Sequence, residues 1–299
     1  MDGVLNILKP PGMTSSNVVS DLRRLCGEKR VGHTGTLDPG AAGVLPVCLG
    51  KATRLFDYLL EKDKSYRAEI TFGAATDTLD AYGKVLFREP SQVNKADFLR
   101  VLPRFVGELE QVPPLYSALK QNGKKLYELA RAGQEDEDAR LKKRRTVRIY
   151  SIDYVAQTGS QSFLFDVTCS RGTYIRTLCE QIASSLGCCA YLSFLLRTRS
   201  GGFAIEHALT IAEAAAAAEQ GILERCLVPM DAAVGFLPRA GVDAGALRLV
   251  QNGNPIPLGA LVERPAGTDC PCRVYCGEVF AGIGTLDEEF LRMKAVLCR

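Results

Sequence analysis

Three stretches of the chain, 66–72, 147–155 and 163–169, carry the pattern that most restricts its fold. In the first of them every second residue is apolar, which is the period of a half-buried strand. The other two are separated by the turn-forming residues 157–160, so we expect them to pair as neighbours. Strands of this kind, interspersed with helices, predict an α+β fold with mixed and mostly antiparallel sheets.

Three helices are predicted from their end signals. One begins after Ser16 and ends at Cys26, a second covers 174–186, and a third covers 211–220. A glycine follows each of them, as is common beyond a helix C-terminus. The segment 30–46 is rich in glycine, threonine and proline, and it is predicted to be a loop.

The chain changes character after about residue 238. Beyond that point short strand-like pieces alternate with glycine and proline turns, such as 252–255 and 276–278. This alternation of short strands and turns indicates a small, mainly β domain. A chain of 299 residues is long enough for one large domain and a small one. We therefore expect one domain at 1–238 and a second at 239–299.

Composition places the chain among ordinary globular proteins, with 46% hydrophobic and 24% charged residues. The sequence lacks the run of about 18 apolar residues that a membrane helix needs. Its first residues do not have the pattern of a secretory signal. We therefore expect an intracellular, cytoplasmic protein. The 11 cysteines, an odd number, do not suggest a disulfide framework.

The candidate metal site in the sequence is the cluster Cys270, Cys272 and Cys276. Its spacing differs from the usual zinc pattern, and the two histidines, His33 and His207, lie far away in the sequence. A metal site is therefore disfavoured, and zinc stays open as the alternative. Phosphate-loop, dinucleotide, GxSxG and HExxH motifs do not occur either, so no nucleotide or redox cofactor is expected.

The charges of the chain leave the partner undecided. The net charge of +3 is too small to identify a nucleic-acid partner. The basic run 142–145 follows an acidic run at 135–138. These charges fit either a solvated loop of mixed charge or an arm that contacts phosphates, and charge alone favours the loop.

Asp38 precedes Pro39 and Gly40 in a segment rich in glycine. Asp-Pro-Gly is a common turn in which the aspartate caps the backbone, and local spacing alone favours this structural interpretation. Four glycines within a dozen residues also allow the backbone to approach a ligand closely. A functional aspartate therefore stays open on this pattern.

The segment 32–45, GHTGTLDPGAAGVL, resembles the catalytic loop of the TruB family of pseudouridine synthases. Further motifs of that family follow one another in family order: NILKPPGMTS at 6–15, KSY at 64–66, TDTLD at 76–80, VPPLYSALK at 112–120, YELAR at 127–131 and CSRGTYIRTL at 169–178. The resemblance implies a pseudouridine synthase catalytic domain over 1–238. The segment 239–299 resembles the small PUA-like RNA-binding domain of bacterial members.

The resemblance assigns Asp38 as the nucleophile, since a carboxylate can add covalently to a nucleoside. Arg176 matches the arginine that pairs with this aspartate and keeps it ionised and oriented. The alternative, a surface arginine, is disfavoured because the helix dipole opposes a cation in the first turn of a helix. Tyr66 matches the tyrosine that stacks on the target base, whereas without the resemblance a core tyrosine is equally acceptable.

Three more residues match positions of the uridine site. Tyr174 and Leu195 match residues that line the pocket, although each of them alone would more often belong to a core. His33 matches the histidine that packs against flipped-out bases of the T-loop. Leu196 stands where many members of the family have an arginine.

The resemblance implies that uridine 55 (U55) in the T-loop of tRNA flips out and is isomerised to pseudouridine. It implies no cofactor, no metal, no obligate protein partner and a monomer. The segment 123–148 matches the insertion that grips the T-arm, which supports the arm over the solvated loop. Two alternatives stay open: a related synthase with another RNA target, including a guide-dependent one, and a non-catalytic RNA chaperone. The complete set Asp38, Tyr66 and Arg176 argues against the chaperone.

Overall fold

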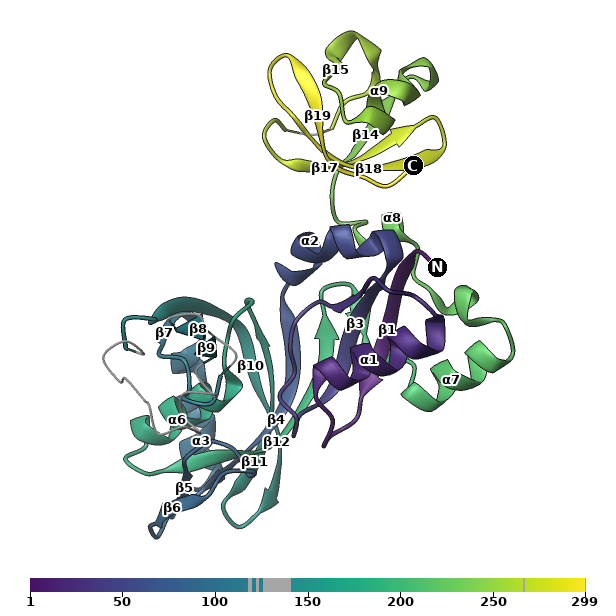
Figure 1. The fold of residues 1–299 in the computed structure, drawn as a ribbon. Helices are drawn as coiled ribbons and strands as arrows, with labels where there is room; N and C mark the ends of the chain where they lie inside the picture. Colours follow the sequence, from purple (N-terminus) through teal and green to yellow (C-terminus); the bar gives the residue numbers. More distant parts are fainter. Residues whose placement is uncertain (118–119, 122–123, 126–140, 266, 299) are drawn as a thin grey trace.

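The computed structural model describes residues 1–117, 120–121, 124–125, 141–265 and 267–298. Figure 1 shows a large sheet in the body of the molecule and a smaller sheet at one end. The helices are α1 (Ser15–Cys26), α2 (Phe56–Leu60), α3 (Lys95–Val101), α6 (Ile175–Ser185), α7 (Ile211–Glu219), α8 (Met230–Ala233) and α9 (Leu247–Asn252). Short 3-10 helices cover Gly50–Leu55, Leu102–Phe105, Ile205–His207, Leu223–Cys226, Ala244–Ala246 and Leu258–Ala260.

The large sheet has nine strands, in the order β1-β3-β12-β4-β11-β10-β7, with β2 paired to β3 and β13 to β12. Their bounds are β1 (Gly3–Lys9), β2 (Val31–His33), β3 (Ala42–Leu49), β4 (Lys64–Phe72), β7 (Gly107–Gln111), β10 (Arg145–Gly159), β11 (Ser162–Cys169), β12 (Ala190–Ser200) and β13 (Phe203–Ala204). Of the pairs in this sheet that the structure describes, β3 with β12 is parallel and the others are antiparallel.

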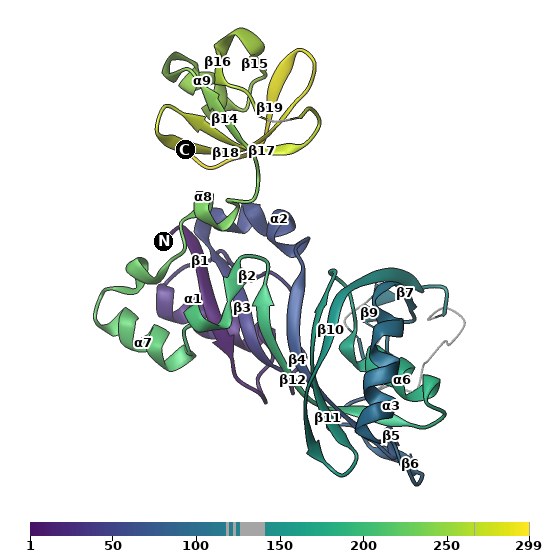
Figure 2. The same cartoon turned by 180° about the vertical axis from the view of Figure 1, so that it is seen from behind.

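Different helices cover the two halves of the large sheet (Figures 1 and 2). Helices α1 and α7 pack on β1 and β3 through an apolar cluster that includes Leu5, Leu22 and Ala214. Helices α3 and α6 pack on β4 and β11 around Phe98 and Ile182. Strand β12 lies between the two halves, so residues on β12 can reach both of them. None of the helices in the described ranges has the length and apolar character that crossing a membrane requires.

The smaller sheet has six strands, in the order β15-β19-β18-β17-β14-β16. Their bounds are β14 (Arg239–Val242), β15 (Ile256–Pro257), β16 (Leu261–Glu263), β17 (Pro271–Cys276), β18 (Val279–Leu286) and β19 (Phe290–Val296). This sheet has its own apolar core with α9, and Ile283 and Leu297 also join a cluster with Val4 and Val44 of the large sheet. The side chain of Arg54 donates to the Val296 carbonyl oxygen at 2.6 Å.

Two short pairs complete the strands of the described residues. Strand β5 (Ala74–Thr76) pairs with β6 (Val85–Arg88), and β8 (Lys120–Gln121) pairs with β9 (Lys124–Lys125). The predicted α+β class with mixed, mostly antiparallel sheets is confirmed. Two matches to the family lie outside the described residues. These are most of the segment 123–148, which matches an RNA-gripping insertion, and the motif at 127–131.

The predicted helices are present as α1, α6 and α7, within two residues at each end. Thr210 caps α7 together with Glu213, and Gly27 ends α1 in the left-handed conformation. The predicted loop at 30–46 is wrong at both ends, because β2 and β3 occupy parts of it. The turn expected at 157–160 lies at residues 160–161, directly after the end of β10.

Gly43 allows a close approach of two backbones in the large sheet. It pairs with Arg197 where β3 and β12 run parallel, and its φ is +120°. A Cβ atom at this position would lie 2.2 Å from the Arg197 carbonyl oxygen and 2.5 Å from its nitrogen. Since both atoms belong to the backbone, neither a rotamer change nor a small shift can relieve the clash.

Gly43→Ala should therefore destabilise the protein by about 2 kcal/mol or more, through the strained φ and the overlap with β12. Chemical unfolding of the purified variant measures this change. Gly32→Ala on the neighbouring strand β2 is the matched control, because among the described residues no atom lies within 4 Å of the place that its Cβ would take. Equal stability of the two variants would contradict the close approach of β3 and β12.

Candidate active site

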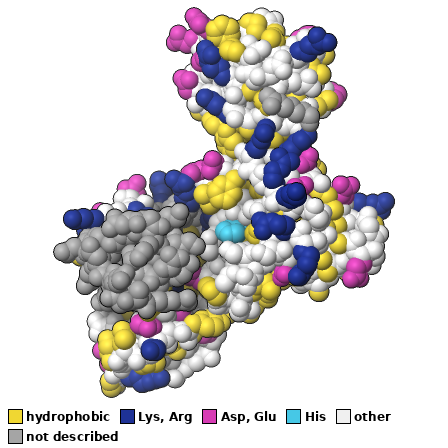
Figure 3. Space-filling model, viewed as in Figure 1, with side chains coloured by type: hydrophobic (Ala, Val, Ile, Leu, Met, Phe, Trp, Pro, Cys, Tyr) yellow, Lys and Arg dark blue, Asp and Glu magenta, His cyan; other side chains and the backbone are white. Residues whose placement is uncertain are grey.

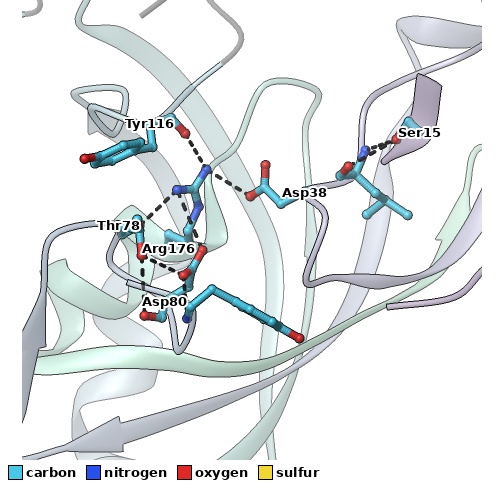
Figure 4. A network of polar contacts seen from close by, with 8 residues as sticks. Ser15, Asp38, Thr78, Asp80, Tyr116 and Arg176 are labelled. Carbon is cyan, nitrogen blue, oxygen red and sulfur yellow. Dashed lines mark hydrogen bonds and ion pairs between the residues drawn. The ribbon is translucent and has the colours of Figure 1, made fainter. Parts of the chain in front are cut away.

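Asp38 lies in the loop between β2 and β3, where the hydroxyl group of Ser15 holds the preceding residue. This hydroxyl donates to the Leu37 carbonyl oxygen at 3.1 Å and accepts from the Leu37 amide at 2.9 Å. The amide of Ala41 donates to the Asp38 carbonyl oxygen at 3.0 Å and closes the turn. Figure 4 shows Ser15 on one side of Asp38 and Arg176 on the other. The fold thus fixes the backbone on both sides of this carboxylate.

The buried side chain of Lys9 connects β1 to the same loop. Its Nζ donates to the carbonyl oxygens of Pro10 at 2.9 Å, Met13 at 2.6 Å and Pro39 at 3.3 Å. Burial lowers the pKa of Lys9 to about 8, and the nearby Asp38 carboxylate opposes this shift. The motif at 6–15 did not predict this role of Lys9, because one of its hydrogen-bond acceptors, the Pro39 carbonyl oxygen, comes from a distant segment of the chain.

Arg176, in the first turn of α6, makes the ion pair to Asp38. Its side chain is only 5% exposed, and Nη2 lies 2.9 Å from Oδ2 of Asp38. Nη2 also donates to the Tyr116 carbonyl oxygen at 3.0 Å, and Nη1 donates to the Thr78 carbonyl oxygen at 2.9 Å (Figure 4). A second carboxylate, that of Asp80, lies 3.9 Å from Nη1. Arg176 is therefore a buried residue whose guanidinium group orients the Asp38 carboxylate.

A cavity of about 710 Å³ opens beside this ion pair. Tyr66 from β4, Tyr174 at the start of α6 and Leu195 from β12 line it together with Asp38 and Arg176. The first three side chains are half-buried, so each of them has a face turned toward the cavity. The structure thus brings five of the six residues matched to the uridine site to one cavity.

A β-bulge explains why Leu195 reaches the cavity. Leu192 pairs with Ile70 and Leu195 pairs with Ala68, so β12 has one extra residue between them. Without this extra residue, Leu192 and Leu195 would point to opposite faces of the sheet. The bulge therefore places Leu195 on the same face as Tyr66, as the cavity requires.

His33 is the matched residue that the structure places elsewhere. It ends β2 and is half-buried, and it is not among the described residues that line the cavity. Its Nδ1 is buried and has no hydrogen-bond partner in the described part of the chain. Burial lowers the pKa of His33, and the positive charge of Arg197 lowers it further. The ring is therefore neutral at neutral pH and suited to stacking.

The cavity has a strongly positive wall. Asp38 is the one carboxylate among the described lining residues, against five cations: Lys64, Arg145, Arg171, Arg176 and Arg197. Arg171 is also paired with Glu61, outside the cavity lining. Burial lowers the pKa of Lys64 to about 8, and the charge of Arg197 adds to this shift. The guanidinium of Arg145 lies 4.5 Å from the ring centre of Tyr174. Such a wall attracts an anionic ligand such as a nucleic acid.

Gln111, on β7, is a site residue that the sequence did not reveal. Its fully buried amide accepts from the Tyr174 amide at 2.9 Å and donates to the Tyr174 carbonyl oxygen at 3.2 Å. Tyr174 precedes α6 without a side-chain cap of its own, so Gln111 fixes both the tyrosine and the start of the helix that carries Arg176. A single glutamine at the end of a strand has no sequence pattern that would predict a hydrogen bond to Tyr174, which is remote in sequence.

Two of the three cysteines in the cluster of the sequence belong to the core of the smaller sheet. Cys272 and Cys276 are buried, and their thiols lie 3.4 Å from the carbonyl oxygens of Gly284 and Asp243, respectively. Cys270 is exposed. Over the described residues, no group of three His, Cys, Asp or Glu side chains is arranged to hold a metal ion.

The motifs and the geometry of this site agree with comparisons to known proteins. The TruB family pseudouridylate synthase N-terminal domain matches residues 23–175, and the tRNA pseudouridylate synthase B C-terminal domain matches residues 176–235. The chain belongs to the TruB family of pseudouridylate synthases. Its fold is that of a pseudouridine synthase catalytic domain with a small PUA-like β domain after it.

Relatives from several bacteria are similar over most of their length. The tRNA pseudouridine synthase B of Pelotomaculum thermopropionicum is 48% identical over 275 residues, which cover 90% of this chain and 86% of the relative. The protein of the same name from Alkaliphilus oremlandii is 45% identical over 299 residues, 99% of this chain and 97% of the relative. Among solved structures, a chain of a Cbf5-Nop10-Gar1 complex matches with a TM-score of 0.77 and 28% identity, covering 99% of this chain and 84% of that one.

The role of Gln111 can be tested by stability. Gln111→Leu leaves the half-buried amide of Tyr174 without its acceptor, whereas the Tyr174 carbonyl oxygen keeps the Leu178 amide as a donor. This change should cost about 1–3 kcal/mol of unfolding free energy. Chemical unfolding measures this loss. Gln157→Leu is the matched control, because Gln157 is exposed and bonds only near its own turn, and it should change the free energy by less than about 0.5 kcal/mol. If the two variants are equally stable, the Gln111 contact does not support α6.

Proposed function

We propose that this chain isomerises U55 in the T-loop of transfer RNA to pseudouridine, with Asp38 as the nucleophile. The observation that carries the proposal is the 2.9 Å ion pair of Asp38 with the buried Arg176, at the edge of a cavity with a cationic wall. The motifs of the TruB family surround both residues in the sequence. Relatives at 45% and 48% identity are named tRNA pseudouridine synthase B.

The reaction exchanges one bond of the nucleoside for another. The bond between N1 of the base and C1′ of the ribose breaks, the base turns, and a bond between C5 and C1′ forms. C5 loses its proton and N1 gains one, so the atoms balance and neither an oxidant nor a reductant is required. Asp38 adds covalently to the nucleoside, and this bond breaks again before the product leaves, so that one difficult step is divided into two easier ones.

The side chains around Asp38 divide the remaining tasks. Arg176 holds the carboxylate of Asp38 in the attacking orientation through a charge-assisted hydrogen bond. Tyr66 stacks on the uracil ring, and since burial raises the pKa of Tyr66, its phenol stays protonated at neutral pH. Tyr174 and Leu195 close the pocket around the base and keep water from the intermediate.

The RNA must present the uridine outside its loop. Flipping costs a few kcal/mol, and contacts to the rest of the T-arm have to offset this cost. His33, outside the cavity, packs against the flipped-out neighbouring bases. Figure 3 shows Lys and Arg side chains gathered near the junction of the two sheets, where they can meet phosphates.

The two parts of the chain have different tasks in this proposal. Residues 1–238 form the catalytic domain, with the insertion at about 123–148 gripping the T-arm, and residues 239–299 form the PUA-like RNA-binding domain. The chain acts as a monomer on tRNA in the cytoplasm. The likeness to a chain of a Cbf5-Nop10-Gar1 complex favours one alternative, a synthase that needs partner proteins. Activity of the isolated chain on tRNA alone separates the two.

The test is tritium release from tRNA that carries uridine labelled at C5, because this label is lost when the base rejoins the ribose through C5. The purified chain should release one label per tRNA from the T-loop, and Asp38→Asn should release none. Asp153→Asn is the matched control, since Asp153 is an exposed aspartate on β10 and should leave the release unchanged.

Each other outcome contradicts a separate part of the proposal. Full release by Asp38→Asn would exclude Asp38 as the nucleophile. Release from an RNA other than the T-arm would keep the chemistry and overturn the substrate. Tight tRNA binding without release by the wild-type chain would favour an RNA chaperone or a need for partner proteins.

A further inference from the structure

Tyr82 is a large aromatic side chain that the proposed function leaves unused. It lies in the turn between β5 and β6, just after the TDTLD motif at 76–80, and it is 70% exposed. Single exposed apolar residues are common and need no explanation by themselves. What distinguishes Tyr82 is its place beside the Asp38 loop and the number of contacts that hold it there.

The turn that carries Tyr82 is bonded to β12. The amide of Ala81 donates to the Leu192 carbonyl oxygen at 3.0 Å, and the Leu192 amide donates to the Leu79 carbonyl oxygen at 3.0 Å. The amide of Tyr82 itself donates to Oδ1 of Asp80 at 3.0 Å. Since these contacts restrain the backbone, the exposed ring is held in a defined position and loses little freedom when a ligand contacts it.

The ring of Tyr82 packs directly on the backbone of the Asp38 loop. A Cβ atom at Gly40 would lie 2.0 Å from Cε2 of the ring, so the ring occupies the space that a side chain at position 40 would need. The Tyr82 hydroxyl group lies 3.5 Å from the Gly40 carbonyl oxygen. The ring is therefore supported from one side by a residue two positions from Asp38, and most of its remaining surface is open.

Tyr82 and the main cavity lie on two sides of the same carboxylate. A small hollow of about 30 Å³ is lined by Asp38, Gly40, Tyr82, Phe194 and Leu195, among others. Asp38 and Leu195 also line the main cavity. Phe194 is 43% exposed, so a second aromatic side chain borders this hollow. A nucleotide chain whose flipped base enters the main cavity can therefore place a neighbouring base on this side of Asp38.

We propose that Tyr82 is a substrate-positioning residue on which an RNA base next to the flipped uridine stacks. Flipping removes a stacking partner from the neighbouring base, and an exposed aromatic ring can replace that partner whatever the identity of the base. This inference rests on the proposed function and adds to it one contact outside the uridine pocket. Tyr82 touches no reacting atom, so its effect is on binding and register of the RNA.

The experiment measures binding without turnover. In the Asp38→Asn background, a T-arm hairpin RNA with 2-aminopurine at one or the other neighbour of the target uridine reports affinity and stacking by fluorescence. Tyr82→Leu should raise Kd at least about fivefold, the equivalent of about 1 kcal/mol, which is the lower end for stacking on one base. It should also abolish the fluorescence quenching that accompanies stacking. Tyr82→Phe keeps the ring and should restore both signals.

Phe87→Leu is the matched control, because Phe87 is 53% exposed on β6 of the same hairpin and lies outside both hollows beside Asp38. It should leave Kd and quenching unchanged. Equal Kd and quenching for Tyr82→Leu and its parent would overturn the inference. So would a Tyr82→Leu substitution in the chain that keeps Asp38, if it lowered the single-turnover rate with no loss of affinity, because Tyr82 would then only support the Asp38 loop. Absence of tritium release by the wild-type chain would instead overturn the proposed function, whatever the Tyr82 variants do.

Discussion

The buried guanidinium group of Arg176 is the interaction on which the arrangement of the site depends. It joins the Asp38 loop, the turn at 78–80 and the segment at Tyr116 to the start of α6, through two ion pairs and two hydrogen bonds to carbonyl oxygens. Removing one partner of a buried charge is strongly destabilising, because the other partner is left uncompensated. The four segments therefore hold one another in place, and the position of the Asp38 carboxylate follows from them.

Irregular backbone around this ion pair shapes the rest of the site. The bulge in β12 places Leu195 on the cavity face, and Gly43 lets β3 approach β12 closely enough for the two halves of the large sheet to join. Lys9 and Ser15 then fix the loop that these strands leave open. A site built in this way is largely formed before its ligand arrives, which lowers the entropic cost of binding.

Local patterns in the sequence predicted the elements that depend on local physics. Alternation revealed β4, and capping signals bounded α1 and α7, because neighbouring residues determine both. Strand β3 was missed since Gly43 and Pro46 interrupt its pattern, and its pairing with β1 and β12 is remote in sequence. The residues of the cavity came from the family resemblance rather than from spacing. Gln111, Lys9 and Arg197 were missed because each acts through carbonyl oxygens of segments that only the fold brings near.

In the proposed reaction, the forked guanidinium group of Arg176, and not its charge alone, orients Asp38 for attack. Arg176→Lys keeps the charge, but a single ammonium cannot reach the carboxylate and both carbonyl oxygens in the same geometry. The decisive measurement is the single-turnover rate of pseudouridine formation by this variant at saturating tRNA. A rate at least about a hundredfold below that of the wild-type chain is predicted, since small displacements of a reacting group have effects of this size. A rate near that of the wild-type chain would contradict the claim that this guanidinium organises the site.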